Sequence, residues 1–486
     1  MTIKDLKPAL VFEIFNEITQ VPRPSKKEGK IRQFLLDFAA KHNLAAKTDA
    51  IGNVVISKGA TPGREGAPTI IMQAHMDMVC ESNDKSFDFE NSPIKTVVDG
   101  DWLRAEGTTL GADNGIGMAG ALAALVDDSL VHGPLEALFT VDEETGLTGA
   151  NNLGANMISG TMLLNLDSED DAEIFVGCAG GVDTTCTFHY HRSFAPTDFH
   201  YFKFDISNGL GGHSGGDIHL GRANANKLLA RFLWNLSTKH EVSLSEIDGG
   251  NLRNAIPRAA HAVFGINSAK KEEVCAAFNM FVADVENEYK GIEPTLKMEL
   301  DSVDRPDFCV DSTTSRNLIA ALYSAPHGVV SMSRDIEGLV ETSTNLASVK
   351  MLDNNVILVT TSQRSSVESR KWDIANQVEA LFTLAGAEVT HGDGYPGWAP
   401  NMDSKIMKIA SDAYEELYGV RPAIKAIHAG LECGLFLQKY PHLDMVSFGP
   451  TLQGVHSPSE RMYIPAVERY WGQLTRILEK VADLKK

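Results

Sequence analysis

The segment "PTIIMQAHMDMV", residues 68–79, decides the fold of the region around it. Its first half is a short apolar run typical of a buried strand, and His75 and Asp77 follow two residues apart. Because side chains on an extended chain alternate between faces, these two polar groups are expected to point the same way. Such a pair at the end of a buried strand either satisfies itself in the core or holds a ligand.

Helices and strands alternate on both sides of this segment. We predict helices over residues 28–42 and 114–128, and strands over residues 53–58, 68–74, 135–141 and 162–166. This alternation is typical of an α/β layer built on a largely parallel sheet. Open sheets of this kind place their ligands at the carboxyl ends of the strands, which is where His75 and Asp77 occur.

Near residue 180 the pattern changes to alternating, half-exposed strands. Residues 180–193, 201–207 and 355–366 fit such strands, and residues 222–236 and 270–289 fit helices. Glycine and proline cluster over residues 392–401 and indicate a return crossing, after which α/β elements resume. We therefore predict one discontinuous α/β domain, residues 1–184 and 394–486, with an inserted α+β domain over residues 185–393.

The composition restricts the class of protein. A chain of 486 residues is too long for one ordinary core, and 43% hydrophobic with 22% charged residues suits a soluble globular protein. The 64 acidic and 44 basic residues give a net charge of -20, which argues against nucleic acid or an anionic membrane as partner. The N-terminal segment does not resemble a signal peptide, and no apolar run is long enough to span a bilayer. The cysteines are scattered, which favours a reducing cytoplasm.

Further acidic groups and a histidine occur at matching points along the chain. Asp113 opens a helix, Glu143 and Glu144 end one strand, Asp167 follows another, and His456 lies in a loop after a strand. Alone, each has an ordinary explanation: a helix N-cap, a surface acid or a satisfied core histidine. Their repetition favours a metal site, because five carboxylates and two histidines clustered without a countercharge would be strongly unfavourable.

Mixed imidazole and carboxylate ligands suit zinc, with manganese or cobalt as substitutes. So many ligands indicate two ions held close by a bridging carboxylate, an arrangement that activates water and polarises a carbonyl. Asp77 need not bind metal, because it can accept the second ring N–H of His75 and fix its tautomer. Of the two adjacent glutamates, one can bind metal while the other handles protons.

Five motifs, "AHMDMV", "GADNGIG", "DEETG", "NLDSE" and "VHSPSE", together resemble those of the M20 metallopeptidases. Three more, "GGHSGGDIHLGRANANKLLARFL", "GGNLRNAIPR" and "HAGLECGLF", resemble the bacterial aminoacyl-histidine dipeptidases of that family. The similarity covers essentially the whole chain. It implies a zinc-peptidase-like catalytic domain, a mixed sheet flanked by helices, with an α+β lid as the insert.

The resemblance also implies roles for individual residues. Two Zn²⁺ ions would share Asp113, with His75 and Asp167 completing one site and Glu144 and His456 the other.

The resemblance further implies that Asp77 orients His75, that Glu143 is the general base, and that His213 of the lid helps to stabilise the oxyanion. Asn254 and Arg364 correspond to lid-side substrate contacts, and His428 and Gly430 to the pocket lining. The ordinary alternatives are an exposed strand residue for Arg364 and a surface loop histidine for His213.

The implied activity is hydrolysis of unblocked dipeptides, preferentially Xaa-His and including β-alanyl-histidine. A metal-bound water would lose a proton to Glu143 and attack the peptide carbonyl. Alternatives are an N-acyl amino acid deacylase, a tripeptidase or a non-catalytic metal-binding module, although Glu143, with no ligand role, favours an enzyme. The partner is a small peptide. The family lid also forms dimer contacts, but this insert is about twice the simple length, so a homodimer and a monomer both stay open.

Overall fold

The computed structural model describes residues 2–484, which form two compact units. The first contains the chain up to Gly177, Pro400–Ala426 and the chain from Leu431 onward. The second contains Cys178–Ala399 and Ile427–Gly430. These units are defined by packing, whereas the boundaries expected from the sequence concern a catalytic domain and a lid, and they remain a prediction.

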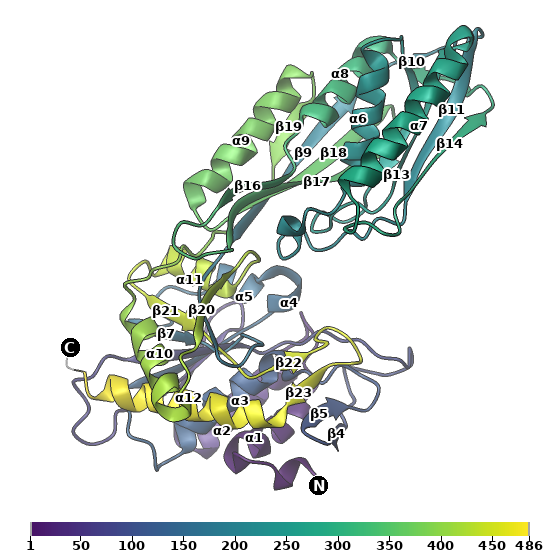
Figure 1. The fold of residues 1–486 in the computed structure, drawn as a ribbon. Coiled ribbons are helices and arrows are strands. Elements are labelled where there is room, and N and C mark those ends of the chain that lie inside the picture. The colour runs from purple at the N-terminus through teal and green to yellow at the C-terminus, as the bar shows by residue number, and fades with distance from the viewer. Residues whose placement is uncertain (1, 485–486) are drawn as a thin grey trace. The chain divides into compact units, whose positions relative to one another are not determined.

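The main sheet of the first unit, of which Figure 1 labels β7, β20 and β21, has a parallel centre and antiparallel edges. Strands β6, β3, β7 and β21 run parallel, while β1 and β2 on one side and β8 on the other pair antiparallel. The predicted mixed sheet flanked by helices is therefore confirmed. Along the sheet the strands are β1 Ala45–Thr48, β2 Val54–Lys58, β6 Leu135–Thr140, β3 Ile70–His75, β7 Met162–Asn165, β21 Asp444–Ser447, β8 Glu173–Cys178 and β20 Ala423–Ile427.

The helices of the first unit pack against this sheet and against one another. They are α1 Ala9–Thr19, α2 Gly29–Lys41, α3 Ala112–Val126, α4 Glu143–Gly146, α5 Thr148–Asn151, α10 Lys405–Tyr418, α11 Glu432–Lys439 and α12 Ile464–Ala482. Helix α3 lies against β3 and β6 and is almost entirely buried, which its small residues allow. A Cβ on Gly117 would lie 2.5 Å from the Leu166 carbonyl oxygen, so a side chain there would push the helix off the sheet.

A second, small sheet in the first unit holds the loop that carries His456. Its antiparallel order is β22 Leu452–Gln453, β23 Arg461–Tyr463, β5 Trp102–Ala105 and β4 Thr96–Asp99. The hairpin between β22 and β23 contains His456, and β5 leads toward Asp113. The small sheet therefore connects two segments that lie more than 300 residues apart in the sequence.

The second unit is built on one continuous antiparallel sheet, with strands β14 Lys297–Val303, β11 Phe199–Ser207, β13 Ala260–Asn267, β12 Ser243–Gly249, β17 Val340–Leu352, β18 Val356–Ser365, β9 Gly180–His189 and β19 Glu388–His391 in that order. Strand β16 Gly328–Met332 pairs with β17, and β10 Arg192–Ser193 pairs with β15 Cys309–Val310. Four helices form a row against the sheet: α7 Lys271–Glu288, α6 Ala225–Ser237, α8 Ser312–Ser324 and α9 Glu368–Leu384.

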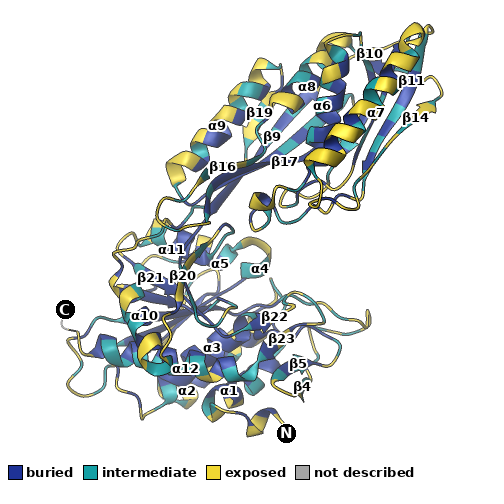
Figure 2. Cartoon of the chain, in the orientation of Figure 1, coloured by how far each residue is buried: buried dark blue, intermediate teal, exposed yellow. Residues whose placement is uncertain are grey.

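Each unit has its own buried interior, seen as dark blue strands and inner helix faces in Figure 2. The interior of the second unit includes a cluster of aromatic rings, in which Phe232 packs edge to face against Phe204 and Phe264 between the sheet and its helices. Over residues 2–484, no helix combines the length and apolar character needed to cross a membrane.

Candidate metal centre and substrate pocket

Neighbouring strands of the first unit deliver the predicted metal ligands to one place. His75 is the last residue of β3, Asp167 follows β7 by two residues, and Glu144 lies in the short helix α4 after β6. Strands β6, β3 and β7 are parallel neighbours, so their carboxyl ends meet at the same edge. Asp113 comes from the first turn of α3, and His456 from the β22–β23 hairpin.

Asp113 lies between two separate pairs of side chains. Its Oδ1 is 3.0 Å from His75 Nε2, which is also 3.4 Å from Asp167 Oδ1. Its Oδ2 is 3.1 Å from His456 Nε2, which is also 3.1 Å from Glu144 Oε2. Each oxygen of Asp113 therefore serves one imidazole and one further carboxylate, which is the arrangement needed to share a carboxylate between two cations.

The cluster carries an excess of negative charge. Burial alone would lower the pKa of His75, but the carboxylates of Asp167 and Asp113 raise this pKa well above its ordinary value. Hydrogen bonds to Asp113 and Glu144 raise the pKa of His456 to about 11. Burial opposes ionisation of Asp113, yet the two histidines hold its pKa well below the ordinary value. Without metal, protonation of the two imidazoles would offset part of this negative charge. Bound cations would offset it in place of these protons.

The residues present fit divalent metal ions. Ligand atoms of His75, Asp113 and Glu144 all lie within 4.8 Å of one another. Among residues 2–484, the buried Oε1 of Glu144 has no hydrogen-bond donor, so one lone pair in the cluster lacks a partner. Imidazole nitrogens with carboxylate oxygens form a donor set that zinc accepts.

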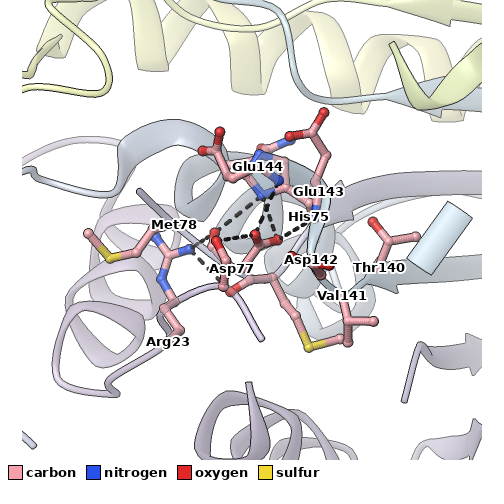
Figure 3. Close-up of polar contacts among 12 residues, drawn as sticks. Arg23, His75, Asp77, Met78, Thr140, Val141, Asp142, Glu143 and Glu144 are labelled. Carbon is pink, nitrogen blue, oxygen red and sulfur yellow. Dashed lines mark hydrogen bonds and ion pairs between the residues drawn. The ribbon is translucent and has the colours of Figure 1, made fainter. Parts of the chain in front are cut away.

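Asp77 lies behind His75 and holds the backbone of helix α4 (Figure 3). Its carboxylate accepts hydrogen bonds from Glu143 N at 3.0 Å, Glu144 N at 3.3 Å and Ser25 Oγ at 2.8 Å. Its Oδ1 also lies 3.4 Å from His75 Nδ1. Burial raises the pKa of Asp77, but the His75 contact and these hydrogen bonds dominate and lower it to about 2. Asp77 is therefore placed to orient His75 and the two glutamates together.

Glu143 is the first residue of α4, adjacent in sequence to Glu144. Burial is the main cause that raises its pKa well above the ordinary value, with Asp167, Glu432 and Glu144 adding to the effect and His75 opposing it. A carboxyl group whose pKa is raised by burial holds a proton more readily, which suits it to taking up and returning a proton.

A buried polar network beneath the cluster was not predicted from the sequence. Asn165 Nδ2 donates to Gln73 Oε1 at 2.6 Å, and Gln73 Nε2 donates to Glu432 Oε2 at 2.6 Å. Thr140 Oγ1 also donates to Glu432 Oε2 at 2.9 Å, and Ser447 Oγ donates to Asn165 Oδ1. The network joins β6, β3, β7 and β21 with α11.

One signal could have revealed part of this network. Gln73 precedes His75 by two residues and Asn165 precedes Asp167 by two, so each pair shares a strand face. In the sequence both amides stand inside apolar runs, where a polar residue needs a partner.

Glu28, Asp77 and Asp142 form a second group of buried carboxylates close enough to bind a cation. Protein donors already satisfy them. Glu28 Oε1 accepts from Lys26 N at 2.7 Å and Asp142 N at 3.0 Å, and Asp142 accepts from the hydroxyls of Thr145 and Thr148. This group therefore supports the turn before Glu143 and is not a second metal centre.

The second unit contains a polar cavity of about 460 Å³ whose lining includes Asn254 and Arg364. Arg364 is only 8% exposed, and its Nη1 donates to the Tyr395 hydroxyl at 2.8 Å. Its Nε has no hydrogen-bond acceptor among the described residues. Arg364 is thus a buried cation with spare donor capacity, and the alternative of an exposed strand residue is wrong.

His428 and Gly430, predicted to line the pocket, are not among the residues that line this cavity, but each lies next to a residue associated with it. His428 Nε2 is 2.7 Å from the Ser343 hydroxyl, and Ser343 is the cross-strand partner of Arg364. A Cβ on Gly430 would lie 2.9 Å from the Tyr395 ring. Burial, followed by the charge of Arg364, lowers the pKa of His428 to about 3, so this histidine is neutral.

His213 is fixed in one tautomer by its own loop. Its Nδ1 accepts hydrogen bonds from Gly215 N at 3.2 Å and Gly216 N at 3.0 Å. Because Nδ1 is an acceptor, the neutral ring carries its proton on Nε2. Burial and then Arg364 lower the pKa of His213, which favours this neutral form. His213 is therefore prepared to donate one hydrogen bond through Nε2.

Tyr395 was missed in the sequence, where its segment indicated only a return crossing. Its hydroxyl accepts from Arg364, and Lys371 Nζ donates to its carbonyl oxygen at 2.8 Å. The structure thus gathers the candidate metal ligands in the first unit and the residues predicted for the lid, with Tyr395, in the second.

Candidate acidic and imidazole ligands at the ends of parallel strands, together with a nearby buried carboxyl group, are the arrangement expected of a metal-dependent hydrolase. The model of peptidase family M20/M25/M40 matches residues 71–480, and the chain belongs to this family. The resemblance expected from its motifs is confirmed, and the protein is a peptidase.

Two relatives cover the whole chain. The cytosol non-specific dipeptidase of Escherichia coli is 41% identical over 480 residues, 99% of either chain. The crystal structure of aminoacylhistidine dipeptidase from Vibrio alginolyticus is also 41% identical, with a TM-score of 0.94 over 100% of this chain and 99% of that one. A tripeptidase structure from Staphylococcus aureus, 16% identical with a TM-score of 0.61 over 99% of this chain and 100% of that one, shares the fold.

Proposed function

We propose that this protein is a dinuclear zinc dipeptidase that hydrolyses unblocked dipeptides, with a preference for Xaa-His that includes β-alanyl-histidine. The observation that carries the proposal is the position of Asp113, whose two oxygens face two different imidazole–carboxylate pairs. The names of the two full-length relatives, both dipeptidases, support the dipeptide substrate. The histidine preference rests on the second of them.

In this proposal His75 and Asp167 would hold one ion, Glu144 and His456 would hold the other, and Asp113 would serve both. Bound zinc would supply a Lewis acid for the peptide carbonyl and would acidify water. Manganese or cobalt can substitute for zinc, since both accept the same nitrogen and oxygen ligands.

Glu143 is the proposed general base and Asp77 its support. Glu143 removes the proton of the attacking water and returns it to the leaving amine. Asp77 fixes the Glu143 backbone through a 3.0 Å hydrogen bond and faces His75 Nδ1 with the same oxygen. One carboxylate therefore positions both a metal ligand and the base, without itself exchanging protons.

The second unit, which includes residues 185–393, is the proposed lid. Arg364 would hold the carboxylate of the substrate's C-terminus, because a guanidinium forms paired hydrogen bonds with a carboxylate and its Nε lacks an acceptor among the described residues. Asn254 lines the same cavity, Gly430 lies against the ring of Tyr395 in its lining, and His428 contacts Ser343, the cross-strand partner of Arg364. His213, with its proton on Nε2, would donate to the oxyanion.

We place the enzyme in the cytoplasm, because the full-length relative from Escherichia coli is named a cytosol dipeptidase. Its partner is a small peptide. The alternative of a homodimer formed through the lid stays a prediction.

A substrate panel tests the function. The zinc, manganese and cobalt forms are assayed for kcat/KM on a dipeptide, its N-acetyl form, its C-terminal amide and the matching tripeptide, with β-alanyl-histidine included. We expect the unblocked dipeptide to be fastest and Xaa-His to exceed other dipeptides. Equal rates for acetylated and free dipeptides would replace the dipeptidase with a deacylase, and a faster tripeptide would identify a tripeptidase.

A further inference from the structure

Two buried charged residues beside the candidate ligands have no role in the mechanism above. Arg23 and Glu460 are each 2% exposed, although charged side chains are seldom buried without a specific partner. Glu460 ends the "VHSPSE" motif, and Arg23 lies in "VPRPS" near the N-terminus. Both contact the backbone of segments that carry candidate ligands.

Glu460 accepts hydrogen bonds from four consecutive backbone N–H groups. Its Oε2 lies 2.7 Å from Leu110 N and 3.0 Å from Gly111 N, and its Oε1 lies 2.8 Å from Ala112 N and 3.4 Å from Asp113 N. Successive N–H groups that converge in this way bind an anion, and here the anion is a side chain of the same protein. The last residue of the turn is the shared carboxylate Asp113, so Glu460 fixes its backbone.

Glu460 also belongs to the loop of another ligand, His456. This loop connects β22 and β23, and β23 pairs with β5 through Arg461 and Arg104. Strand pairing thus anchors one end of the loop, and the Glu460 carboxylate ties that end to the Asp113 turn. Two candidate ligands of the same metal ion, Asp113 and His456, therefore depend on the Glu460 carboxylate for their position.

Arg23 makes the complementary contact to carbonyl groups (Figure 3). Its Nη1 donates to Asp77 O at 2.6 Å and Met76 O at 3.2 Å, and its Nη2 donates to Gly111 O. A Cβ on Gly111 would lie 2.6 Å from this Nη2, and Gly111 has a φ of +67°, so the turn requires glycine. Arg23 thus joins the segment after His75 to the Asp113 turn.

We propose that Glu460 and Arg23 are positioning residues that hold the three ligand segments around His75, Asp113 and His456 in the geometry that binds the metal pair. Glu460 secures the N–H side of the Asp113 turn and Arg23 secures its carbonyl side. The proposal rests on the metal assignment in the proposed function. It concerns metal affinity and coordination geometry, and it assigns neither residue a contact with substrate.

Glu460→Gln is the first test. Glutamine keeps the size and one oxygen, but its amide NH₂ would face two backbone N–H donors. Residues that support metal ligands typically contribute about 10- to 100-fold to metal affinity, so we expect a loss of that size. Zinc affinity is measured by titrating metal-free protein in competition with a chromogenic zinc chelator. The absorption bands of the cobalt form, which report coordination geometry, should shift as well.

Glu136→Gln is the matched control. Glu136 is 7% exposed in the same unit and accepts from Ser159 N at 2.9 Å and Gly160 N at 3.0 Å, at the start of β6. Its variant should lower the unfolding midpoint of the metal-free protein but leave zinc affinity and the cobalt spectrum unchanged. If Glu460→Gln behaves in the same way, its role is purely structural and the proposal is overturned.

Arg23→Lys provides a second variant in case Glu460→Gln does not fold. Lysine keeps the charge but cannot reach two segments with a rigid fork. We expect about tenfold weaker zinc binding or more, and wild-type affinity would refute the Arg23 half of the proposal. The Asp113→Ala variant distinguishes failure of the metal assignment from failure of the positioning role. If it still binds two zinc ions, the metal assignment fails, whereas metal loss in Asp113→Ala with normal binding in both other variants rejects only the positioning role.

Discussion

The metal cluster of the first unit and the cavity of the second unit handle charge in opposite ways. Around Asp113 carboxylates outnumber histidines, and their field raises the pKa values of His75 and His456. Around Arg364 the histidines are neutral, because burial and the guanidinium lower the pKa values of His213 and His428. In the absence of metal, the same side-chain type therefore favours the protonated form in one place and the neutral form in the other. The first site is suited to cations and the second to an anionic group.

Loss of the shared carboxylate should have the largest effect. We expect Asp113→Ala to lose bound metal and all measurable turnover, because one carboxylate serves both half-sites. Glu143→Ala should keep its metal and lose about 10²- to 10⁴-fold in kcat, the usual contribution of a general base. Elemental analysis measures the metal content of the Asp113→Ala and Glu143→Ala variants, and steady-state kinetics measures their kcat. A metal-free Glu143→Ala with a fully loaded Asp113→Ala would reverse the two assignments.

His213→Ala should come next, with a loss of about 10²-fold in kcat and little change in KM. An oxyanion donor acts mainly in the transition state, and the fixed Nε2 proton of His213 suits that role. Steady-state kinetics on one dipeptide measure both constants. A variant with wild-type kcat would reduce His213 to a loop histidine.

Arg364→Ala should lower kcat/KM by about 10- to 100-fold for a dipeptide with a free C-terminus, since a hydrogen bond to a charged group contributes about 1.5 to 3 kcal/mol. The corresponding C-terminal amide should lose much less. Arg253→Ala is the control, because Arg253 lines the same cavity but its side chain is 75% exposed and pairs with Asp183. Equal losses for acid and amide would show that Arg364 does not bind the carboxylate.

The smallest expected effect concerns stability against pH. The pKa of His428 is lowered to about 3 in the folded protein, below the ordinary value of 6.5. Between these values the unfolded chain binds more protons, so this group makes stability fall as the pH drops from about 6.5 toward 3. At pH 5 the loss from His428 is about 2 kcal/mol. Denaturant unfolding of metal-free wild type and His428→Gln at pH 8 and pH 5 measures it, and parallel pH profiles would contradict it.

Much of the candidate metal cluster could be predicted because several of its residues follow apolar runs. His75, Asp167 and the adjacent Glu143 and Glu144 all come directly after predicted strands, and a buried charge in such a position needs a partner. The residues predicted for the lid could not be recognised in this way. Arg364 and Asn254 stand in segments whose side chains have no such periodic signal, so their identification depended on the family resemblance.

The sequence by itself determined the alternation of strands and helices, the inserted α+β region, the candidate ligands and the family, because these depend on local periodicity and short motifs. Only the tertiary structure decided which oxygen of Asp113 faces which histidine, that Tyr395 meets Arg364, and that Glu432 ends a polar network. It also decided that the Glu460 carboxylate accepts hydrogen bonds from the backbone of the Asp113 turn, about 350 residues away in the sequence. These contacts join residues far apart in the chain, and their distances exist only once strand order and loop paths bring the backbones together.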